Sequence, residues 1–443
     1  MTSLDAFAAR MVDYTPDDSE RAALTLHLVD SLGAIWCGMG LSAVDDLTAP
    51  WKRSDAYPEH LPSPILAGLL AASGRATEMD DILLSAAVTP GTPLTGALLA
   101  ALREEPDRAE RLLVALGAGY ETAAWLGSLI GGPDVLYQGI WPTYWVTPAA
   151  VAVALACLWE FTPDQLGEAM VIALSLSVGA SGRIRHPRTS RWLTLAHAVA
   201  GGYLAAMAAQ EGMVGDQSLL SPDGFRHGWG FTWTLNTKVA VGRAAGHTSL
   251  KPFSVARQTL CAVEAFQSLL ASESVALDQV AAVTVEVPVA YYAMVRPQPI
   301  SAPMTPWTDV AHVLALAATE PNRLYDLGRD TALTAPAQAL KERIAVRPAR
   351  DLDAFYPEHW PARVTVFTTR GTLGAVILDA PGDPSKPLTE TAVLEKVQRA
   401  ACHHPPPLSG FDRELHCLLS SPTSPAFWAS AGERLIQALW ARR

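Results

Sequence analysis

The chain has 443 residues, and 49% of them are hydrophobic, which is enough to bury a large core and to form two structural domains. Its formal net charge of −11, from 33 basic and 44 acidic residues, argues against nucleic acid or an anionic membrane as a partner. The five cysteines lie far apart without a C-x-x-C pair, which indicates neither a zinc site nor a redox pair. This pattern fits a reducing compartment, and we expect a cytoplasmic protein.

The N-terminal half of the chain predicts helices. Residues 20–40 carry leucines at helical spacing, and residues 93–130 and 147–213 are rich in alanine and leucine. Thr162 followed by Pro163 is a typical helix start, with the threonine as the N-cap. Repeated small residues in these stretches favour helices that pack closely on all sides, as in the centre of a large bundle.

The sequence lacks the usual signals for membrane insertion and for nucleotide or metal binding. The N-terminus is acidic and has no basic start followed by an apolar block, so no signal peptide is expected. The longest apolar runs, residues 146–158 and 170–180, are shorter than the roughly 20 residues of a transmembrane helix. Neither a phosphate loop nor metal-ligand spacing occurs, and we expect no metal or nucleotide requirement.

The pattern changes in the C-terminal part of the chain. Residues 280–289 alternate apolar and polar side chains and are β-branched, which predicts a strand. Residues 362–378 predict a hairpin that turns at Arg370 and Gly371, with helical patterns between the strand and the hairpin. Residues 387–401 return to a helical pattern. The sequence therefore predicts a mainly α protein, in which a smaller α+β segment interrupts a helical body.

Several further segments follow one another in a fixed order along nearly the whole chain. They are LVDSLGAIWCG (28–38), EMDDILLSAAVTPGTPLTGALLA (78–100), YQGIWPT (137–143), RWLTLAHAVAGG (191–202), LKPFSVARQTL (250–260) and YPEHWPARVTVFTTRG (356–371). No single segment is decisive. Their shared order resembles the MmgE/PrpD family, which includes 2-methylcitrate dehydratase, cis-aconitate decarboxylase and iminodisuccinate epimerase.

The resemblance implies how the chain is organised. Residues 1–255 would form the first part of a large all-helical body, residues 256–401 an inserted smaller α+β lid, and residues 402–443 a linker and a C-terminal helix that return to the body. It also implies a homodimer and a small-molecule substrate, without a metal or organic cofactor. The family acts on carboxylates by proton abstraction, with His, Lys, Asp and Tyr side chains between body and lid and with cations that stabilise the enolate-like charge.

Several family histidines are replaced in this chain, among them the histidine of the Lys-x-Leu-His motif, which is Thr194 here. The family's Asp-Asp-Thr motif appears as Asp80 and Asp81 followed by an isoleucine, so the carboxylates are kept. The histidine that follows this motif in the family is Thr89 here. The histidine of the family's Gly-aromatic-His motif is Trp141.

Other family positions change the charge chemistry of the expected site. Lys251 keeps the lysine at the lid hinge, whereas the lysine of the family's Lys-x-Leu-His motif is Arg191, and Thr308 aligns near a lid tyrosine. Arginine is permanently charged and binds anions well, but it is a poor proton shuttle. Losing one positioned acid or base typically lowers a rate roughly a hundred- to ten-thousand-fold, so ordinary dehydratase or decarboxylase chemistry is not expected.

We therefore predict a pocket between body and lid, with aromatic walls and a few polar groups that steer an acidic ligand. The candidate catalytic residues are Asp81, Thr89, Tyr144, Arg191 and Lys251. The candidate substrate-binding residues are Asp80, Tyr137, Trp141, Trp145, Arg183, Arg188, Trp192, Trp307 and Thr308. Structural roles are the alternatives: the aspartates could cap a helix, the tryptophans could be core residues, residues 182–191 could be a solvated loop, and Lys251 could be an ordinary hinge lysine.

Three functional hypotheses follow. The first is a cofactor-independent lyase- or isomerase-like enzyme, repurposed in bacterial specialised metabolism to isomerise or cyclise a bulky, largely apolar acidic substrate such as a polyketide. The second is a conventional dehydratase, decarboxylase or epimerase of a small carboxylate. The third is a catalytically inactive binding or dimerisation partner. A large aromatic cavity would favour the first hypothesis, a compact cation-lined cavity the second, and a filled cavity the third.

Overall fold

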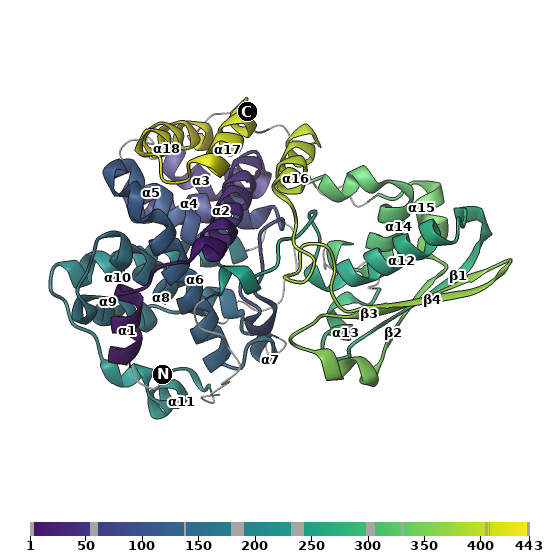
Figure 1. Ribbon diagram of the computed structural model, residues 1–443, viewed down its shortest axis with the longest axis horizontal. Coiled ribbons are helices and arrows are strands. Elements are labelled where there is room, and N and C mark those ends of the chain that lie inside the picture. The colour runs from purple at the N-terminus through teal and green to yellow at the C-terminus, as the bar shows by residue number, and fades with distance from the viewer. Residues whose placement is uncertain are drawn as a thin grey trace.

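The computed structural model describes residues 4–53, 61–136, 139–178, 190–231, 243–297, 306–328, 332–403, 406 and 408–440. Helices dominate these residues, and a four-stranded sheet lies in the C-terminal part. Figure 1 shows the helical body beside the smaller part that carries the sheet, which we call the lid. The predicted fold class, a mainly α body with an inserted α+β lid, is confirmed.

The body begins with eleven described helices. They are α1 (Leu4–Val12), α2 (Asp18–Gly38), α3 (Ser42–Arg53), α4 (Ser63–Ala76), α5 (Gly91–Glu104), α6 (Leu112–Leu129), α7 (Pro133–Leu136), α8 (Pro142–Leu158), α9 (Pro163–Ser175), α10 (Arg191–Gln210) and α11 (Pro222–Trp229). Helix α9 starts where the sequence predicts, because Thr162 Oγ1 accepts the N–H of Gln165 at 3.3 Å and Gln165 Oε1 accepts the N–H of Thr162 at 3.1 Å.

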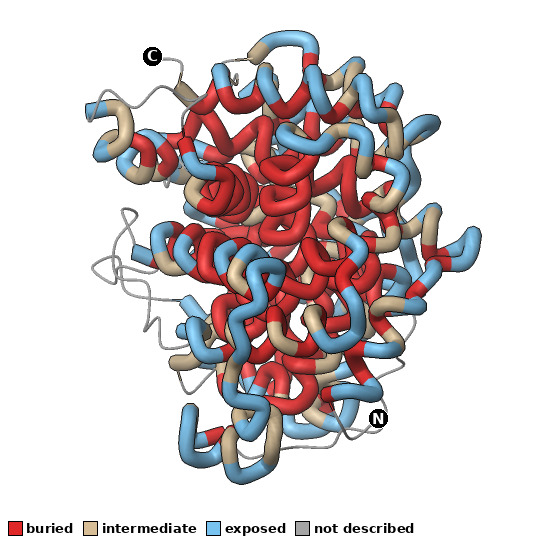
Figure 2. The backbone as a smooth tube through the Cα atoms, turned by 90° about the vertical axis from the view of Figure 1, so that its left-hand side faces the viewer, coloured by how far each residue is buried: buried red, intermediate tan, exposed pale blue. Residues whose placement is uncertain are grey.

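Helix α8 lies at the centre of the body. All of its residues are buried, and it packs against α6, α9 and α10. A helix that is apolar on every side has no solvent face, so neighbours must surround it. Glycines permit the close approach, because a Cβ on Gly202 would overlap the Pro148 carbonyl and a Cβ on Gly68 would overlap that of Ala196. Figure 2 shows the resulting buried interior with exposed residues at its rim.

The lid has a sheet in the order β2-β1-β3-β4. Its elements are α12 (Leu260–Ser272), β1 (Val280–Val287), α13 (Val289–Val295), α14 (Val310–Thr319), α15 (Ala335–Lys341), β2 (Ile344–Pro348), β3 (Ala362–Thr368) and β4 (Gly371–Ile377). The predicted strand is β1 and the predicted hairpin is β3–β4, and β1 also pairs in parallel with the unpredicted edge strand β2. Alternate residues of β1, such as Val283 and Val285, are buried in one cluster with α12.

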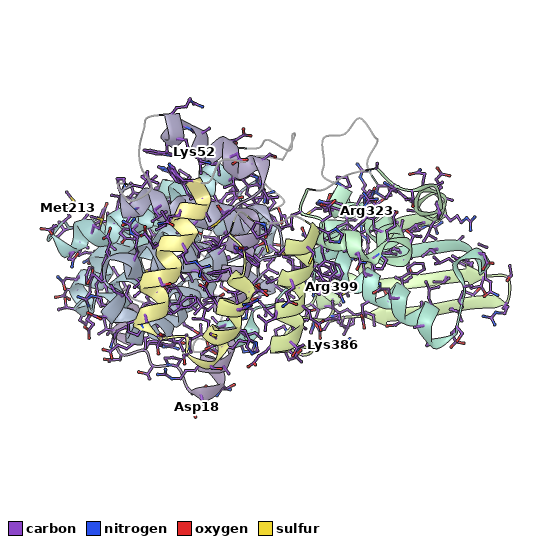
Figure 3. The ribbon with its side chains drawn as sticks, turned by 90° about the horizontal axis from the view of Figure 1, so that it is seen from above. Asp18, Lys52, Met213, Arg323, Lys386 and Arg399 are labelled. Carbon is purple, nitrogen blue, oxygen red and sulfur yellow. The ribbon has the colours of Figure 1, made fainter. Side chains whose placement is uncertain are left out.

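The chain then returns to the body through α16 (Glu390–His403), α17 (Phe411–Ser420) and α18 (Pro425–Trp440). Helix α16 lies at the seam, since it contacts both α2 of the body and the lid turn η9 (Pro321–Tyr325). The Arg399 guanidinium lies over the Tyr325 ring, 5.2 Å from its centroid. Figure 3 shows Arg399 where the body meets the lid.

Two stretches of the described residues are long and apolar enough to cross a membrane by length and composition alone. They are Pro106–Leu129, which is 89% buried over its apolar window, and Arg191–Gln210, which is 67% buried. The apolar runs predicted from the sequence, residues 146–158 and 170–180, are shorter and lie outside these two stretches. Both stretches pack against other helices of the body.

Candidate active site

A cavity of about 290 Å³ lies between the body and the lid. Six residues of its lining were predicted as site residues, namely Thr89, Trp141, Arg191, Lys251, Trp307 and Thr308. The other lining residues are Arg75, Glu78, Ile82, Ala87, Leu136, Gly139, Ala256, Arg257, Gln258, Ala290, Ala293, Met294 and Trp360. The lining therefore combines aromatic and aliphatic walls with a small group of charged side chains.

A second and larger cavity, of about 720 Å³, also lies between body and lid. In it, His359 Nδ1 lies 2.6 Å from Asp379 Oδ1, and the Ser385 hydroxyl donates to Asp379 Oδ2 at 2.8 Å. None of the predicted site residues that the structure describes lines this cavity. The smaller cavity is therefore the candidate active site.

Three cations converge on the carboxylate of Glu78 at one end of the site. Arg75 Nη1 lies 2.8 Å from Glu78 Oε2, Lys251 Nζ lies 3.8 Å from the same oxygen, and Arg191 Nη1 lies 3.9 Å from Oε1. Behind this group, Asp80 Oδ1 accepts from Arg75 at 3.1 Å and lies 3.4 Å from Lys251 Nζ. Asp80 does not line the cavity, and it acts on the site through these two cations.

The end of helix α4 places this charged cluster. Arg75 is in the last turn of α4, and the chain leaves the helix at Thr77. Glu78 then has a φ of 55°, in the left-handed region that few residues other than glycine adopt. Such backbone strain persists where the surrounding contacts fix it, and here the ion pairs of Glu78 do so.

Arg191 is held in an aromatic and polar cage. Its guanidinium carbon lies 3.9 Å from the Trp141 ring centroid and 5.2 Å from that of Trp192. Its Nε donates to the hydroxyl of Tyr144 at 3.1 Å. The side chain of Arg191 is only 3% exposed, so the cation–π contact acts in a poorly solvated place, where it is strongest. Trp192 and Tyr144 support Arg191 from outside the cavity lining.

Burial shifts the two central charges of the cluster toward neutrality. Loss of solvent raises the pKa of the Asp80 carboxyl, although Arg75 and Lys251 oppose this shift. Loss of solvent also lowers the pKa of the Lys251 amine, although Asp80 and Glu78 oppose it. A lysine with a lowered pKa is a better proton acceptor near neutral pH than an ordinary surface lysine.

Asp81 lies in a separate, fully buried network. Its Oδ2 accepts from the Tyr120 hydroxyl at 2.5 Å and lies 3.0 Å from His27 Nδ1. Its Oδ1 accepts the N–H of Gly91, the first residue of α5, at 3.0 Å. These contacts match the helix-capping alternative for this residue, and Asp81 does not line the cavity.

The remaining predicted residues differ in their placement. Thr89 lines the cavity, and its hydroxyl lies 3.2 Å from that of Thr143. Trp145 is fully buried in the body among Phe225, Trp229 and Phe231, with ring centroids 5.2 to 5.4 Å away, and does not line the cavity. Three predicted residues lie outside the described residues, namely Tyr137, Arg183 and Arg188.

The lid closes the cavity with aromatic and sulfur-containing side chains. Trp307 and Thr308 come from the short turn η8 (Pro306–Thr308), which is fixed because the Trp307 carbonyl accepts the N–H of Ala256 at 3.1 Å. Trp307 is 3% exposed, and its Nε1 has no hydrogen-bond partner among the residues that the structure describes. Opposite this wall, Gln258 Nε2 lies 3.1 Å from the sulfur of Met294.

Sequence reasoning missed Arg75 and Glu78, which complete the charged cluster. Glu78 stands in the EMDD segment that carried the resemblance, two residues before Asp80. The signal that could have revealed it is the spacing Arg-x-x-Glu-x-Asp at residues 75–80, directly after a helical pattern. Among the described residues, no group of three or more His, Cys, Asp or Glu side chains converges as metal ligands would.

Comparison with known families finds two models that match this chain. A model of the MmgE/PrpD N-terminal domain matches residues 6–238, and a model of the MmgE/PrpD C-terminal domain matches residues 253–408. The two matches cover most of the chain. A search of curated proteins returned no match.

Proposed function

The chain belongs to the MmgE/PrpD family, whose members are generally enzymes of the dehydratase, decarboxylase or epimerase type, and from this premise we propose a more specific activity. We infer that the protein is a cofactor-independent lyase- or isomerase-like enzyme of specialised metabolism. Its substrate has one acidic end and a largely apolar body, and the reaction is an isomerisation or an intramolecular cyclisation. The observation that carries this proposal is the caged arginine, Arg191 on Trp141, between a charged cluster and an apolar cavity.

The charge balance of the site suits a single carboxylate. Arg75, Lys251 and Arg191 supply three positive charges, and Glu78 and Asp80 supply two negative charges when both are ionised. Among the described lining residues, the further cation Arg257 is paired with a buried aspartate of the lid hinge. While Lys251 is protonated, the described residues of the cluster therefore carry one net positive charge, which one acidic group of a ligand neutralises.

The cavity volume limits the size of the apolar body. About 290 Å³ is at the lower end of ordinary small-molecule sites. A compact substrate with one ring or a short folded chain fits this volume, whereas a long polyketide exceeds it. The aromatic walls of Trp141, Trp307 and Trp360 give such a body flat surfaces to pack on.

Proton transfer is assigned to Lys251. When Lys251 has lost its proton, Arg75 and Arg191 hold the acidic end of the substrate, and the neutral amine takes a proton from the carbon beside the substrate's carbonyl or carboxyl group. The ammonium then returns the proton to another carbon, so the product is an isomer and no atom is lost. Arg75 and Arg191 stabilise the negative charge that develops in between, and the hydroxyl of Thr89 supplies a further donor.

A conventional lyase or epimerase of a small carboxylate is the second candidate. The compact volume and the unpredicted cation Arg75 favour it. The open cavity does not support the third reading, an inactive partner, for which a filled site was expected.

The decisive experiment is to identify the compound that accumulates when the gene is deleted and to convert it with purified protein. We expect a product of unchanged mass, formed without added metal or nucleotide. A product that has lost water or carbon dioxide, or an epimer of a small polar carboxylate, would replace this proposal with the second candidate. Activity that a chelator abolishes and a divalent ion restores would contradict cofactor independence.

A further inference from the structure

Lys396 is a buried cation that lies outside the cavity lining. It belongs to α16, which returns from the lid to the body, and it is only 2% exposed. A lysine is almost never fully buried unless its charge is paired, so its partners show what it does.

The Lys396 ammonium has three partners from three parts of the chain. Its Nζ donates to the carbonyl oxygen of Lys251 at 2.9 Å and to that of Met79 at 3.2 Å. It also forms an ion pair with Asp30 of α2. The two carbonyl oxygens accept two of the three ammonium protons, and the Asp30 carboxylate balances the positive charge.

Two of these partners are main-chain carbonyl groups of active-site segments. Met79 stands between Glu78 and Asp80, and Lys251 is the proposed proton-transfer residue. One ammonium therefore joins the segment that carries both carboxylates to the segment that carries the amine.

We propose that Lys396 is a positioning residue, which fixes Lys251 against the Asp80 segment and anchors it to the helical body. This inference rests on the proposed function only for the catalytic role of Lys251. Lys251 is thus held to the helical body through Lys396 and Asp30, and the lid residues of the cavity lie against it.

Contacts at the hinge agree with this assignment. The N–H of Leu250 donates to the carbonyl of Gly382 at 2.9 Å, which joins the chain entering the lid to the chain leaving it. The Ser249 hydroxyl donates to Asp383 Oδ1 at 2.8 Å, and Arg257 pairs with the same carboxylate. The residues around Lys251 are thus fixed on both sides.

Asp30 is the charge partner of Lys396 in this arrangement. Burial raises the pKa of its carboxyl, whereas the adjacent Lys396 ammonium lowers it. Removing one member of a buried pair leaves an uncompensated charge and destabilises a protein strongly, whereas neutralising both members is far better tolerated. The test therefore changes both residues together.

The experiment follows the side-chain nitrogen of Lys251 by NMR, in protein labelled with ¹⁵N only at lysine. The chain has six lysines, so the spectrum is simple, and Lys251→Arg identifies the signal of interest by its loss. The test variant is Asp30→Asn with Lys396→Met, which removes the donors to both carbonyls without leaving an unpaired charge. Lys52→Met, on α3 of the body, is the control that removes a lysine outside this pair.

We expect the titration midpoint of Lys251 to rise by about one pH unit or more in the double variant, because the released amine leaves its buried position. Lys52→Met should leave the midpoint close to that of the wild type. An unchanged midpoint in the folded double variant would overturn the proposal, and so would an equal rise in Lys52→Met. The measurement uses no substrate, so its failure and the failure of the proposed reaction are distinguishable.

Discussion

Replacing Trp141 by alanine removes the ring on which Arg191 lies. The guanidinium carbon of Arg191 is 3.9 Å from the Trp141 centroid, and Arg191 is 3% exposed. A desolvated cation–π contact of this kind contributes about 2 kcal/mol. If Arg191 binds the acidic end of the ligand, we expect Trp141→Ala to weaken the binding of a carboxylate about thirtyfold. Trp141→Phe keeps an aromatic face and should lose less than about fivefold.

The assay is isothermal titration calorimetry with 3-phenylpropanoate, an aromatic monocarboxylate, as the probe. Trp51→Ala, on α3 outside the cavity lining, is the matched control and should bind as the wild type does. Trp141 also forms part of the apolar wall, so a double-mutant cycle with Arg191→Met separates its two roles. We expect a coupling energy of about 1 to 2 kcal/mol between Trp141 and Arg191. Additive effects, with a coupling below about 0.5 kcal/mol, would refute the assignment of Arg191 as the carboxylate anchor.

Three further predictions concern charge, assembly and stability. Burial lowers the pKa of Lys251. As the pH rises, Lys251 therefore loses its positive charge at a lower pH than an ordinary lysine does. Binding of 3-phenylpropanoate should therefore weaken as pH rises through that range, and Lys251→Met should abolish this dependence. We propose that the predicted homodimer forms through the exposed apolar side chains of α10, such as Leu204 and Met207, so light scattering should show a monomer for Leu204→Glu. Burial also lowers the pKa of His312 to about 4. Between pH 6.5 and 4 the unfolded state then binds more protons than the folded state. As the pH is lowered through this window, the contribution of His312 to the free energy of unfolding should fall by up to about 3 kcal/mol in denaturant titrations. His312→Gln should lack this contribution.

Local patterns in the sequence predict most of the fold. The alternation of residues 280–289 predicts β1, and the hairpin turns where Gly371 has a φ of 146°, a conformation that favours glycine. The edge strand β2 is not predicted, because it has only five residues and ends at Pro348. Its partner β1 lies in a distant part of the chain. Strand pairing of this kind depends on tertiary structure, which no local window contains.

The candidate site could be predicted only in part, for a similar reason. The resemblance brings Trp141, Arg191 and Lys251 together, and the structure places all three in one cavity lining. Arg75 is an unremarkable arginine at a helix end until the fold brings Lys251 and Arg191 to the adjacent Glu78. The sequence shows the chemical type of each side chain, whereas the convergence of their charges depends on how body and lid pack.

The central claim is that the site binds one carboxylate beside an apolar wall. Calorimetry at a single ionic strength tests it most directly, by comparing 3-phenylpropanoate with propane-1,2,3-tricarboxylate on the wild-type protein. Among the described residues, three cations opposed by Glu78 and Asp80 leave one positive charge, so we predict that the monocarboxylate binds at least about tenfold more tightly. Tighter binding of the tricarboxylate would contradict the account.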